Sequence, residues 1–474
     1  MIPTVGLEVH AQLRTSSKIF CGCSAAFGAE PNTHVCPVCL GLPGALPVLN
    51  ARAVEFAVRA ALAFGCTIHP VSRFARKHYF YPDLPKGYQI SQYDEPLATG
   101  GVVTVAMEAG PRRVGLVRIH IEEDAGKSLH LDDAGTAVDF NRSGVGLIEI
   151  VTKPEIDSAA LAGACFSRIR DVLVALGVND GNMEEGSLRC DANVSIRADA
   201  AAPLGVKTEV KNINSFRFVQ RAIEFEVARQ TAMVETGQSV EPETRLWDPG
   251  AARTIPMRNK EEAQDYRYFP EPDLLPLTVS MAWLAGITAS MPEMPDAKRE
   301  RFVRDYELPE YDAGVLTQSL ALADYFEATA AASGNPKAAS NWIMVEGLGR
   351  LNAAGMSIGD MRVTPEALAR LIRLVESGRI TGPTAKAVFE RMFAEGGDAE
   401  ALVAAGGLAR VDDDDAIEAL VRETLAQHPV PVAHYRAGKR QAFGFLVGQV
   451  MKSSGGRSDP AKTSAALRRI LDSE

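Results

Sequence analysis

The segment GLEVHAQL, residues 6–13, alternates apolar and polar side chains along its whole length. Successive side chains of a β-strand point to opposite faces, so a period of two predicts a strand with one buried face. The apolar face would carry Leu7, Val9, Ala11 and Leu13, and the polar face Glu8, His10 and Gln12. Two ionisable groups, Glu8 and His10, would therefore lie close together on the polar face.

Four later segments show the same alternation and extend the prediction from one strand to a sheet. They are VRIHIEEDAG (117–126), GLIEIVTKP (146–154), SLRCDANVSIR (187–197) and VKTEVK (206–211). In the first of them, we expect Val117, Ile119 and Ile121 on the apolar face. Strands that are apolar on one side only are typical of antiparallel sheets. The sequence thus predicts an α+β protein built on a mostly antiparallel sheet.

Helix signals are interspersed with these strands and dominate after residue 295. Ser215 precedes a helical apolar stripe, and Thr364 followed by Pro365 is typical of a helix start. Beyond this point the strand pattern disappears, and alanine, leucine and charged residues prevail. We therefore predict a sheet domain over 1–295, a helical domain over 296–405 and a helical tail domain over 406–474, with the second boundary at an Ala-Ala-Gly-Gly interruption.

The composition is that of a globular protein, with 46% hydrophobic and 23% charged residues in a chain of 474. A formal net charge of −10 argues against a protein that binds nucleic acid over its whole surface. The stretch 434–474 is locally basic, because it holds eight Lys/Arg against three Asp/Glu. No apolar run is long enough to span a bilayer, and the first residues show no leader pattern, so we expect a cytoplasmic protein without membrane association.

Four of the seven cysteines lie in CGCSAAFGAEPNTHVCPVC, residues 21–39. The pairs Cys21/Cys23 and Cys36/Cys39 are joined by a short loop of turn-forming residues, which suits a tetrahedral zinc site with four thiolate ligands. Four thiolates complete the coordination shell, so such a zinc ion would be structural. The alternatives are four unliganded cysteines or a site that no longer binds metal.

The predicted polar face is rich in carboxylates and imidazoles. Its groups are Glu8, His10, Glu122, Glu123, Glu149, Asp191 and Glu209, with Glu184 and Glu185 just before one strand and Arg142, Arg189, Lys207 and Lys211 as basic partners. Neighbouring carboxylates repel one another unless cations lie between them. Magnesium with a polyphosphate would satisfy both the acidic and the basic groups. A salt-bridged surface sheet is the alternative.

Two proline-stiffened loops add aromatic side chains, RKHYFYPDLPKGYQISQYD (76–94) and DYRYFPEPDLLPL (265–277). Aromatic rings on loops suit a planar or sugar-linked ligand, although rings also plug the edges of sheets. The sequence contains no phosphate-binding loop, dinucleotide fingerprint or nucleophile elbow. A nucleotide bound by this chain would therefore require another architecture.

Taken together and in this order, the longest motifs closely resemble the B subunit of the tRNA-dependent glutamyl/aspartyl amidotransferases. The matching stretches are GLEVHAQL, RKHYFYPDLPKGYQISQYD, IEEDAGKS, DFNRSGVGLIEIV, MEEGSLRCDANVSIR, EVKNINSFRFVQRAIEFEVARQ, DYRYFPEPDLLPL and GFLVGQVMK. The resemblance implies a kinase-like cradle domain followed by helical domains, the last of which contacts tRNA. It also implies a heterotrimer with an amidase, the A subunit, and with a small C subunit. That enzyme uses ATP and Mg²⁺ on tRNA(Gln) or tRNA(Asn) mischarged with glutamate or aspartate.

Position by position, the resemblance implies roles for residues of this chain. The catalytic magnesium cluster would be Glu8, His10, Glu122, Glu123 and Glu149, and the nucleotide site would include Glu184 and Asp191, to which the polar face adds Arg142, Lys207 and Glu209. In the tail, Lys439, Arg440, Lys452 and Arg457 would contact tRNA phosphates. The chain departs from the family pattern at Gly146, where a proline is usual, and this affects the geometry of one turn.

Two other functions stay open from the sequence. The chain could be a non-catalytic, zinc-containing RNA-binding scaffold, or a free-standing ATP-dependent ligase that needs no partner. A scaffold predicts unchanged amidation after a polar-face carboxylate is lost, and a free-standing ligase predicts full glutamine-dependent activity for the chain alone. No segment resembles an amidase nucleophile site, so we expect this chain to depend on a partner for ammonia.

Overall fold

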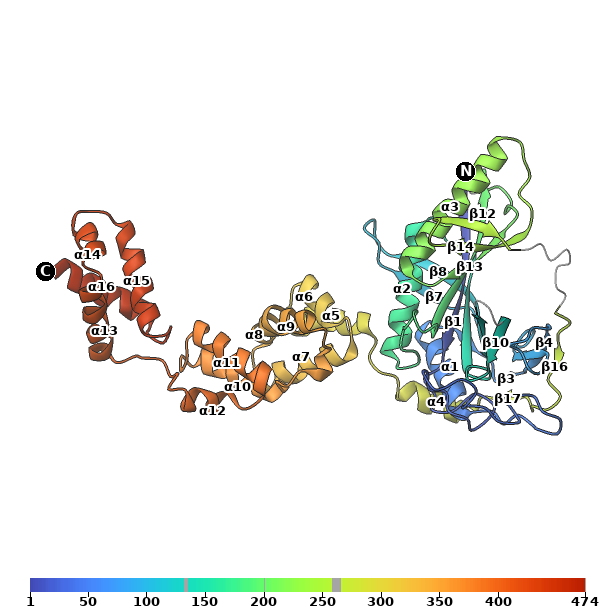
Figure 1. Cartoon of the computed structure of the whole chain (residues 1–474), viewed down its shortest axis with the longest axis horizontal. Coiled ribbons are helices and arrows are strands. Elements are labelled where there is room, and N and C mark those ends of the chain that lie inside the picture. The colour runs from blue at the N-terminus through green and yellow to red at the C-terminus, as the bar shows by residue number, and fades with distance from the viewer. Residues whose placement is uncertain (132–134, 200, 258–265, 474) are drawn as a thin grey trace. The chain divides into compact units, whose positions relative to one another are not determined.

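The computed structural model describes residues 1–131, 135–199, 201–257 and 266–473. These residues form two compact units, Met1–Met294 and Pro295–Glu474. The first unit contains a large sheet with helices packed on it, and the second unit is helical, as Figure 1 shows. Within the described ranges, no helix combines the length and the apolar character needed to cross a membrane.

The large sheet has ten strands, and β1 lies in its interior. In spatial order the strands are β15 (Arg253–Pro256), β14 (Glu243–Asp248), β13 (Thr208–Ile213), β12 (Leu188–Arg197), β1 (Ile2–Gln12), β11 (Gly146–Thr152), β8 (Arg112–Glu123), β6 (Ala98–Thr99) and β2 (Thr67–Ile68), with β7 (Val102–Val105) also paired to β8. Strands β13 and β14 pair in parallel, and the other pairings in this sheet are antiparallel. The protein is therefore mixed α and β, with a large, mostly antiparallel sheet.

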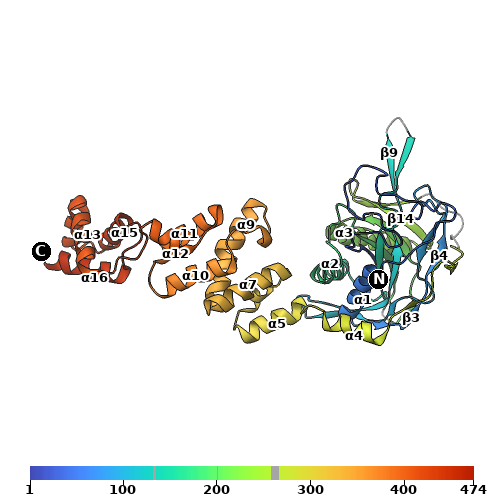
Figure 2. The ribbon, with the colours of Figure 1, turned by 90° about the horizontal axis from the view of Figure 1, so that it is seen from below.

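Among the residues that the structure describes, three small sheets and four helices complete the first unit. The small sheets are β9 (Lys127–Leu131) with β10 (Gly135–Asp139), β4 (Ala75–His78) with β5 (Tyr88–Ser91) and β16 (Phe269–Pro270), and β3 (Val71–Ser72) with β17 (Leu277–Thr278). The helices are α1 (Ala51–Ala63), α2 (Ala159–Ala175), α3 (Phe216–Glu235) and α4 (Met281–Ala289). Helices α1, α2 and α3 lie next to one another in Figure 2 and share one apolar core with the sheet.

The alternation along β1 separates two environments, as predicted. Leu7, Val9 and Ala11 have no exposed surface and belong to the core beneath the helices. Glu8 and His10 point to the opposite face, where both are half-buried. Each buried aliphatic side chain stabilises the fold by roughly 1.5–3 kcal/mol, so the core determines which face of β1 is turned inward.

Strand β8 breaks the alternation at one point. Val151 pairs with Arg118, but the next residue, Thr152, pairs with Leu116, so β8 contains a bulge there. The bulge leaves Val117 40% exposed and places Leu116 in the core. The prediction that Val117 shares the apolar face was therefore wrong. A hydrophobicity pattern does not reveal such a bulge when both neighbouring residues are apolar.

The helix starts predicted at polar caps are confirmed. The Ser215 hydroxyl accepts a hydrogen bond of 3.1 Å from the backbone N–H of Phe218 at the start of α3. Thr364 caps the helix that begins at Pro365 in the same way, through the N–H of Ala367. These side chains satisfy backbone donors that have no partner within the helix.

The second unit consists of short helices. They are α5 (Pro295–Asp305), α6 (Glu310–Leu316), α7 (Leu320–Ser333), α8 (Pro336–Asn341), η1 (Trp342–Gly347), α9 (Leu348–Ala354), η2 (Ile358–Asp360), α10 (Pro365–Glu376), α11 (Gly382–Glu395), α12 (Ala399–Ala405), α13 (Asp414–Gln427), α14 (Pro429–Arg436), α15 (Gln441–Ser453) and α16 (Pro460–Ser473). Their buried apolar residues form two clusters, one within 302–403 and one within 417–471. The division of this unit near residue 405 stays a prediction.

Replacing Ile121 by alanine should destabilise the first unit by about 2–5 kcal/mol, because the side chain is fully buried and its loss leaves a cavity. Val117→Ala, four residues away in the same strand, should cost less than about 1 kcal/mol because Val117 faces outward. Urea unfolding followed by the fluorescence of the buried Trp247 measures both changes. Equal losses for the two variants would contradict the bulge.

Candidate active site

A row of three ionisable side chains crosses the polar face of the sheet at its centre. The pairing of β1 with β11 sets His10 opposite Glu149, and the pairing of β11 with β8 sets Glu149 opposite His120. The Glu149 carboxylate lies 3.5 Å from Nε2 of His10 and 3.2 Å from Nε2 of His120. Register alone thus places one carboxylate between two imidazoles.

Glu122 completes this cluster from β8. Its carboxylate oxygens lie 3.7 Å from Nε2 of His10 and 3.5 Å from Nε2 of His120. His10, Glu122 and Glu149 each offer one ligand atom, and these three atoms lie within 4.8 Å of one another. They are close enough to hold a single metal ion. Two carboxylates and an imidazole form a donor set that a divalent cation such as Mg²⁺ or Mn²⁺ accepts.

The cluster shifts the pKa values of its members in opposite directions. Burial works against charge on His120, but the negative charge of Glu149 and a hydrogen bond to Glu122 outweigh it and raise its pKa to about 9. Burial alone would raise the pKa of Glu149, yet His120 and His10 hold it well below the usual range. Without a metal, the His120 imidazole therefore carries positive charge that the carboxylates require.

Glu8 lies next to this cluster on β1 rather than within it. Its carboxylate accepts a hydrogen bond of 2.8 Å from the Asn193 side chain. Burial, together with the charges of Glu149 and Glu209, raises the pKa of Glu8. Glu8 is thus a carboxyl group whose proton is held more tightly than that of a free glutamate.

The other predicted polar-face residues occupy the neighbouring strands. Lys211 places its ammonium 3.2 Å from Asp191 and 3.0 Å from Glu209, so these two carboxylates share one cation. Glu209 also accepts a hydrogen bond of 2.9 Å from Thr244. Lys207 precedes β13 and is exposed.

Glu123 is not part of the acid and imidazole cluster. Its side chain is buried against Lys86, whose ammonium lies 2.7 Å away, and it accepts a hydrogen bond of 2.8 Å from the N–H of Ile90. Adjacent residues of a strand point to opposite sides, so the side chains of Glu122 and Glu123 lie in different surroundings. Glu123 belongs to a structural ion pair between the end of β8 and Lys86, which lies just before β5.

Sequence reasoning did not assign Asp124, Lys77 or His120 to the site, although the structure brings all three to this region. The carboxylate of Asp124 is buried and accepts two hydrogen bonds of 3.0 Å from Arg189, as well as one of 2.9 Å from Gln12. Burial opposes the charge on Lys77, but Glu122 and other negative groups raise its pKa. The alternation placed His120 on the polar face, and that signal would have justified including it.

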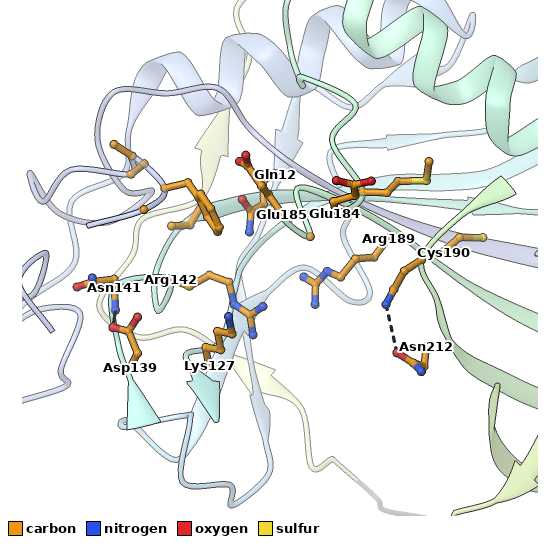
Figure 3. A pocket seen from close by; sticks show the side chains of 18 of the residues that line it. Gln12, Lys127, Asp139, Asn141, Arg142, Glu184, Glu185, Arg189, Cys190 and Asn212 are labelled. Atoms are coloured by element: carbon orange, nitrogen blue, oxygen red, sulfur yellow. Dashed lines mark hydrogen bonds between the residues drawn. The ribbon is translucent and has the colours of Figure 1, made fainter. Parts of the chain in front are cut away.

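A pocket of 740 Å³ opens beside the cluster. Gln12, Arg189 and Asp191 line it from β1 and β12, and Lys127 and Arg142 line it from the opposite side, as Figure 3 shows for four of these residues. The pocket collects Lys127, Arg142, Arg189 and Lys211 as basic groups. Its size and its basic lining suit a ligand that carries several negative charges.

Arg142 and Glu184 take different positions in this pocket. The guanidinium of Arg142 donates to the carbonyls of Ala125 and Gly126 at 2.9 and 2.6 Å, and these bonds hold the side chain in place. Glu184 and Glu185 are exposed. They line the same pocket, where carboxylates suit hydroxyl or amino groups rather than phosphate.

The aromatic loops meet beside the cluster. Tyr93 and Tyr268 stack face to face, with ring centroids 4.1 Å apart and planes 5° from parallel. The ammonium of Lys77 lies 4.8 Å from the ring centroid of Tyr266. Rings held in this way present flat, partly polar surfaces near the carboxylates.

The four cysteines converge as the spacing predicted. Their sulfur atoms lie within 4.8 Å of one another, and Sγ of Cys36 lies 3.9 Å from Sγ of Cys39. A tetrahedron with zinc–sulfur bonds of ~2.3 Å requires sulfur separations of roughly 3.8 Å. The arrangement therefore fits a zinc ion. A hydrogen bond from the Cys21 thiol is the main cause that lowers the pKa of Cys39. The positive charge of the fully buried Lys18 lowers this pKa further.

The tail residues differ in their surroundings. Lys439 and Arg440 lie in the turn between α14 and α15, and Lys452 lies near the end of α15; all three are exposed. Arg457 is half-buried and donates hydrogen bonds of 2.8 Å to the carbonyls of Ser454 and Gly407. Its guanidinium thus also has a role in holding the tail together.

Comparison with known proteins defines the class. The model of the GatB/GatE catalytic domain matches residues 3–285, and that of the GatB domain matches residues 324–471. The chain belongs to the GatB family of amidotransferase subunits. A relative from Thermodesulfovibrio yellowstonii is 52% identical over 98% of both chains, and one from Anaeromyxobacter sp. is 54% identical over 98% of both. Each is named as the B subunit of an aspartyl/glutamyl-tRNA(Asn/Gln) amidotransferase.

Lys86→Met should destabilise the first unit by about 3–5 kcal/mol, because it leaves the buried Glu123 carboxylate without its cation. The double variant Lys86→Met/Glu123→Gln should recover part of this loss, since no buried charge then remains. Chemical unfolding of the single and double variants measures the coupling. An additive result, with no recovery, would show that the two groups do not depend on each other.

Proposed function

We propose that this chain is the tRNA-binding and carboxylate-activating subunit of a glutamine-hydrolysing amidotransferase. It would convert Glu-tRNA(Gln) or Asp-tRNA(Asn) to Gln-tRNA(Gln) or Asn-tRNA(Asn) in the cytoplasm. The observation that carries this proposal is the convergence of His10, Glu122 and Glu149 beside a basic pocket, in a chain of the GatB family. The family membership favours this function over a non-catalytic RNA scaffold.

His10, Glu122 and Glu149 would hold Mg²⁺, and Glu8, two residues before His10 on the same face of β1, would bind it through a water molecule. A bound Mg²⁺ neutralises phosphate charge and allows a carboxylate to approach ATP. The two glutamates offer the hard oxygen ligands that this ion prefers, and His120 would release the positive charge that it holds in the absence of the ion. Glu123 is not needed for this site, because Lys86 already neutralises it.

The 740 Å³ pocket would bind ATP. Lys127, Arg142 and Arg189 would neutralise the phosphates, and Glu184 would accept hydrogen bonds from hydroxyl groups of the nucleotide. Asp191 and Glu209 would keep Lys211 in position for the same task. Lys207 would contribute long-range charge only, because it is exposed.

The chemistry follows from the poor leaving group of a carboxylic acid. The side-chain carboxylate of the tRNA-bound amino acid would attack the γ-phosphorus of ATP, so that ADP leaves and an acyl phosphate forms. Ammonia would then add to the acyl carbon, and phosphate would leave with the C–O bond electrons. A partner amidase, the A subunit, joined through a small C subunit, would release this ammonia from glutamine and deliver it uncharged.

The tail would bind the tRNA backbone. Lys439, Arg440 and Lys452 are exposed cations on one helical region, which suits phosphate contacts that do not depend on sequence. Arg457 would contribute as well, with two of its N–H groups held by carbonyls as in Arg142. Binding through such groups should weaken as the salt concentration rises.

Glu149→Gln should lower the amidation rate at least about 100-fold, because it removes a charged metal ligand at the centre of the cluster. It should also weaken Mn²⁺ binding to the complex while leaving tRNA affinity unchanged. Glu155→Gln is the matched control, since Glu155 is exposed and lies outside the cluster. Unchanged amidation by the Glu149 variant would favour the scaffold. Full glutamine-dependent activity of the chain without partners would favour a free-standing ligase.

The purified protein should contain about one structural zinc ion per chain. Cys36→Ser should lose this metal and lower the thermal unfolding midpoint, because four-thiolate zinc contributes folding free energy. Cys66→Ser, a buried cysteine outside the cluster, should retain the metal. Elemental analysis and thermal unfolding measure both effects. Wild-type protein without zinc after metal-replete expression would contradict the assignment.

A further inference from the structure

One wall of the 740 Å³ pocket is formed by the end of β10 and the loop that follows it. Asp139, the last residue of β10, lines the pocket together with Asn141 and Arg142 of the connection between β10 and β11. In Figure 3 this wall faces Arg189 and Glu184. Hydrogen bonds outside the large sheet must hold this connection, because its residues belong to none of the ten strands.

Asn32, in the four-cysteine segment, supplies such hydrogen bonds. Its side-chain amide donates to the carbonyl of Val138 at 3.0 Å, and its side-chain oxygen accepts from the N–H of Phe140 at 2.8 Å. Its backbone N–H donates to the carboxylate of Asp139 at 2.9 Å. One asparagine thus contacts three consecutive residues of the wall, much as a neighbouring strand would.

Asn141 connects the same two segments from the other side. Its side-chain amide donates to the carbonyl of Glu30 at 2.8 Å, and its side-chain oxygen accepts from the N–H of His34 at 2.8 Å. Residues 30–34 and 138–141 therefore form one hydrogen-bonded unit. The backbone adds a separate connection further along, because the N–H of Ile19, ahead of the first cysteine pair, donates to the carbonyl of Gly144 at 2.9 Å.

The backbone of Asn32 explains why an asparagine suits this position. Its φ is 59°, a left-handed conformation that asparagine tolerates better than most residues with a side chain. An asparagine amide also offers a donor and an acceptor together, which the backbone groups of Val138 and Phe140 require. Glycine would keep the backbone but lose both side-chain bonds, and aspartate would lose the donor.

We propose that Asn32 is a positioning residue for the nucleotide, acting through the pocket wall that carries Asp139, at the end of β10, and Asn141 and Arg142, in the loop after it. This inference rests on the proposed ATP site. The four-cysteine segment then has a task beyond stability: it holds the pocket wall at the distance that the phosphates require. Asn32 itself touches neither the nucleotide pocket nor the acid and imidazole cluster.

The test compares Asn32→Gly with the wild type in the complete complex. A non-hydrolysable ATP analogue with Mg²⁺ should bind roughly three- to tenfold more weakly to the variant. Without the two side-chain hydrogen bonds of Asn32 the pocket wall is less ordered, and ordering it on binding costs part of the binding free energy. The KM for ATP should rise by a similar factor while kcat at saturating ATP stays within about twofold. Asn32→Asp should show the same direction of change. Asn335→Gly, which removes a helix cap in the second unit, is the matched control and should change neither value.

Amide hydrogen exchange supplies a second measurement. Exchange at residues 138–142 should be faster in Asn32→Gly, while β1 and β8 keep their protection. An unchanged affinity in a complex whose wild type binds the analogue would overturn the role of Asn32. A fall in kcat without a change in KM, or weaker binding without faster exchange at 138–142, would overturn it as well. A wild-type complex that binds no ATP analogue would instead overturn the proposed function.

Discussion

The register of β1 between β11 and β12 is the constraint on which the site depends. It sets His10 opposite Glu149 on one side and Arg189 on the other. A shift by a single residue would turn Glu8 and His10 into the core and expose Leu7 and Val9. Burying those ionisable groups without partners would cost far more than the strand pairing provides. The apolar core thus holds the register that aligns the polar groups.

The acidic groups of the first unit are neutralised in two different ways. Asp124 and Glu123 have permanent cations, Arg189 and Lys86, at hydrogen-bond distance. Glu122 and Glu149 face imidazoles instead, and an imidazole can give up its proton. A carboxylate with an arginine or lysine partner is neutralised without a metal ion. A carboxylate with an imidazole partner can exchange that positive charge for a metal ion, which is what the proposed activity requires.

Periodicity was sufficient to place Glu8, His10 and Glu149 on one face, because the alternation follows directly from strand geometry. It failed at Val117, where a bulge adds a residue between two apolar positions. Glu123 was grouped with the cluster as a neighbouring acid and through the family resemblance, although strict periodicity puts adjacent strand residues on opposite sides. The contacts of Asn32 with residues 138–140 could not be predicted, because they depend on the path of two loops that are 106–108 residues apart. Local pattern therefore defined the strands and one face of the site, and tertiary structure defined the pocket wall.

The interior position of β1 also affects how the protein is made. Its partners β11 and β12 end at Thr152 and Arg197, so β1 cannot complete its pairing until the chain has been synthesised through Arg197. At ordinary elongation rates this delay lasts roughly 10–40 s. During that time an alternating, half-apolar segment has both edges unpaired and is open to aggregation. Nascent chains of this protein should therefore need chaperone protection until β12 has emerged.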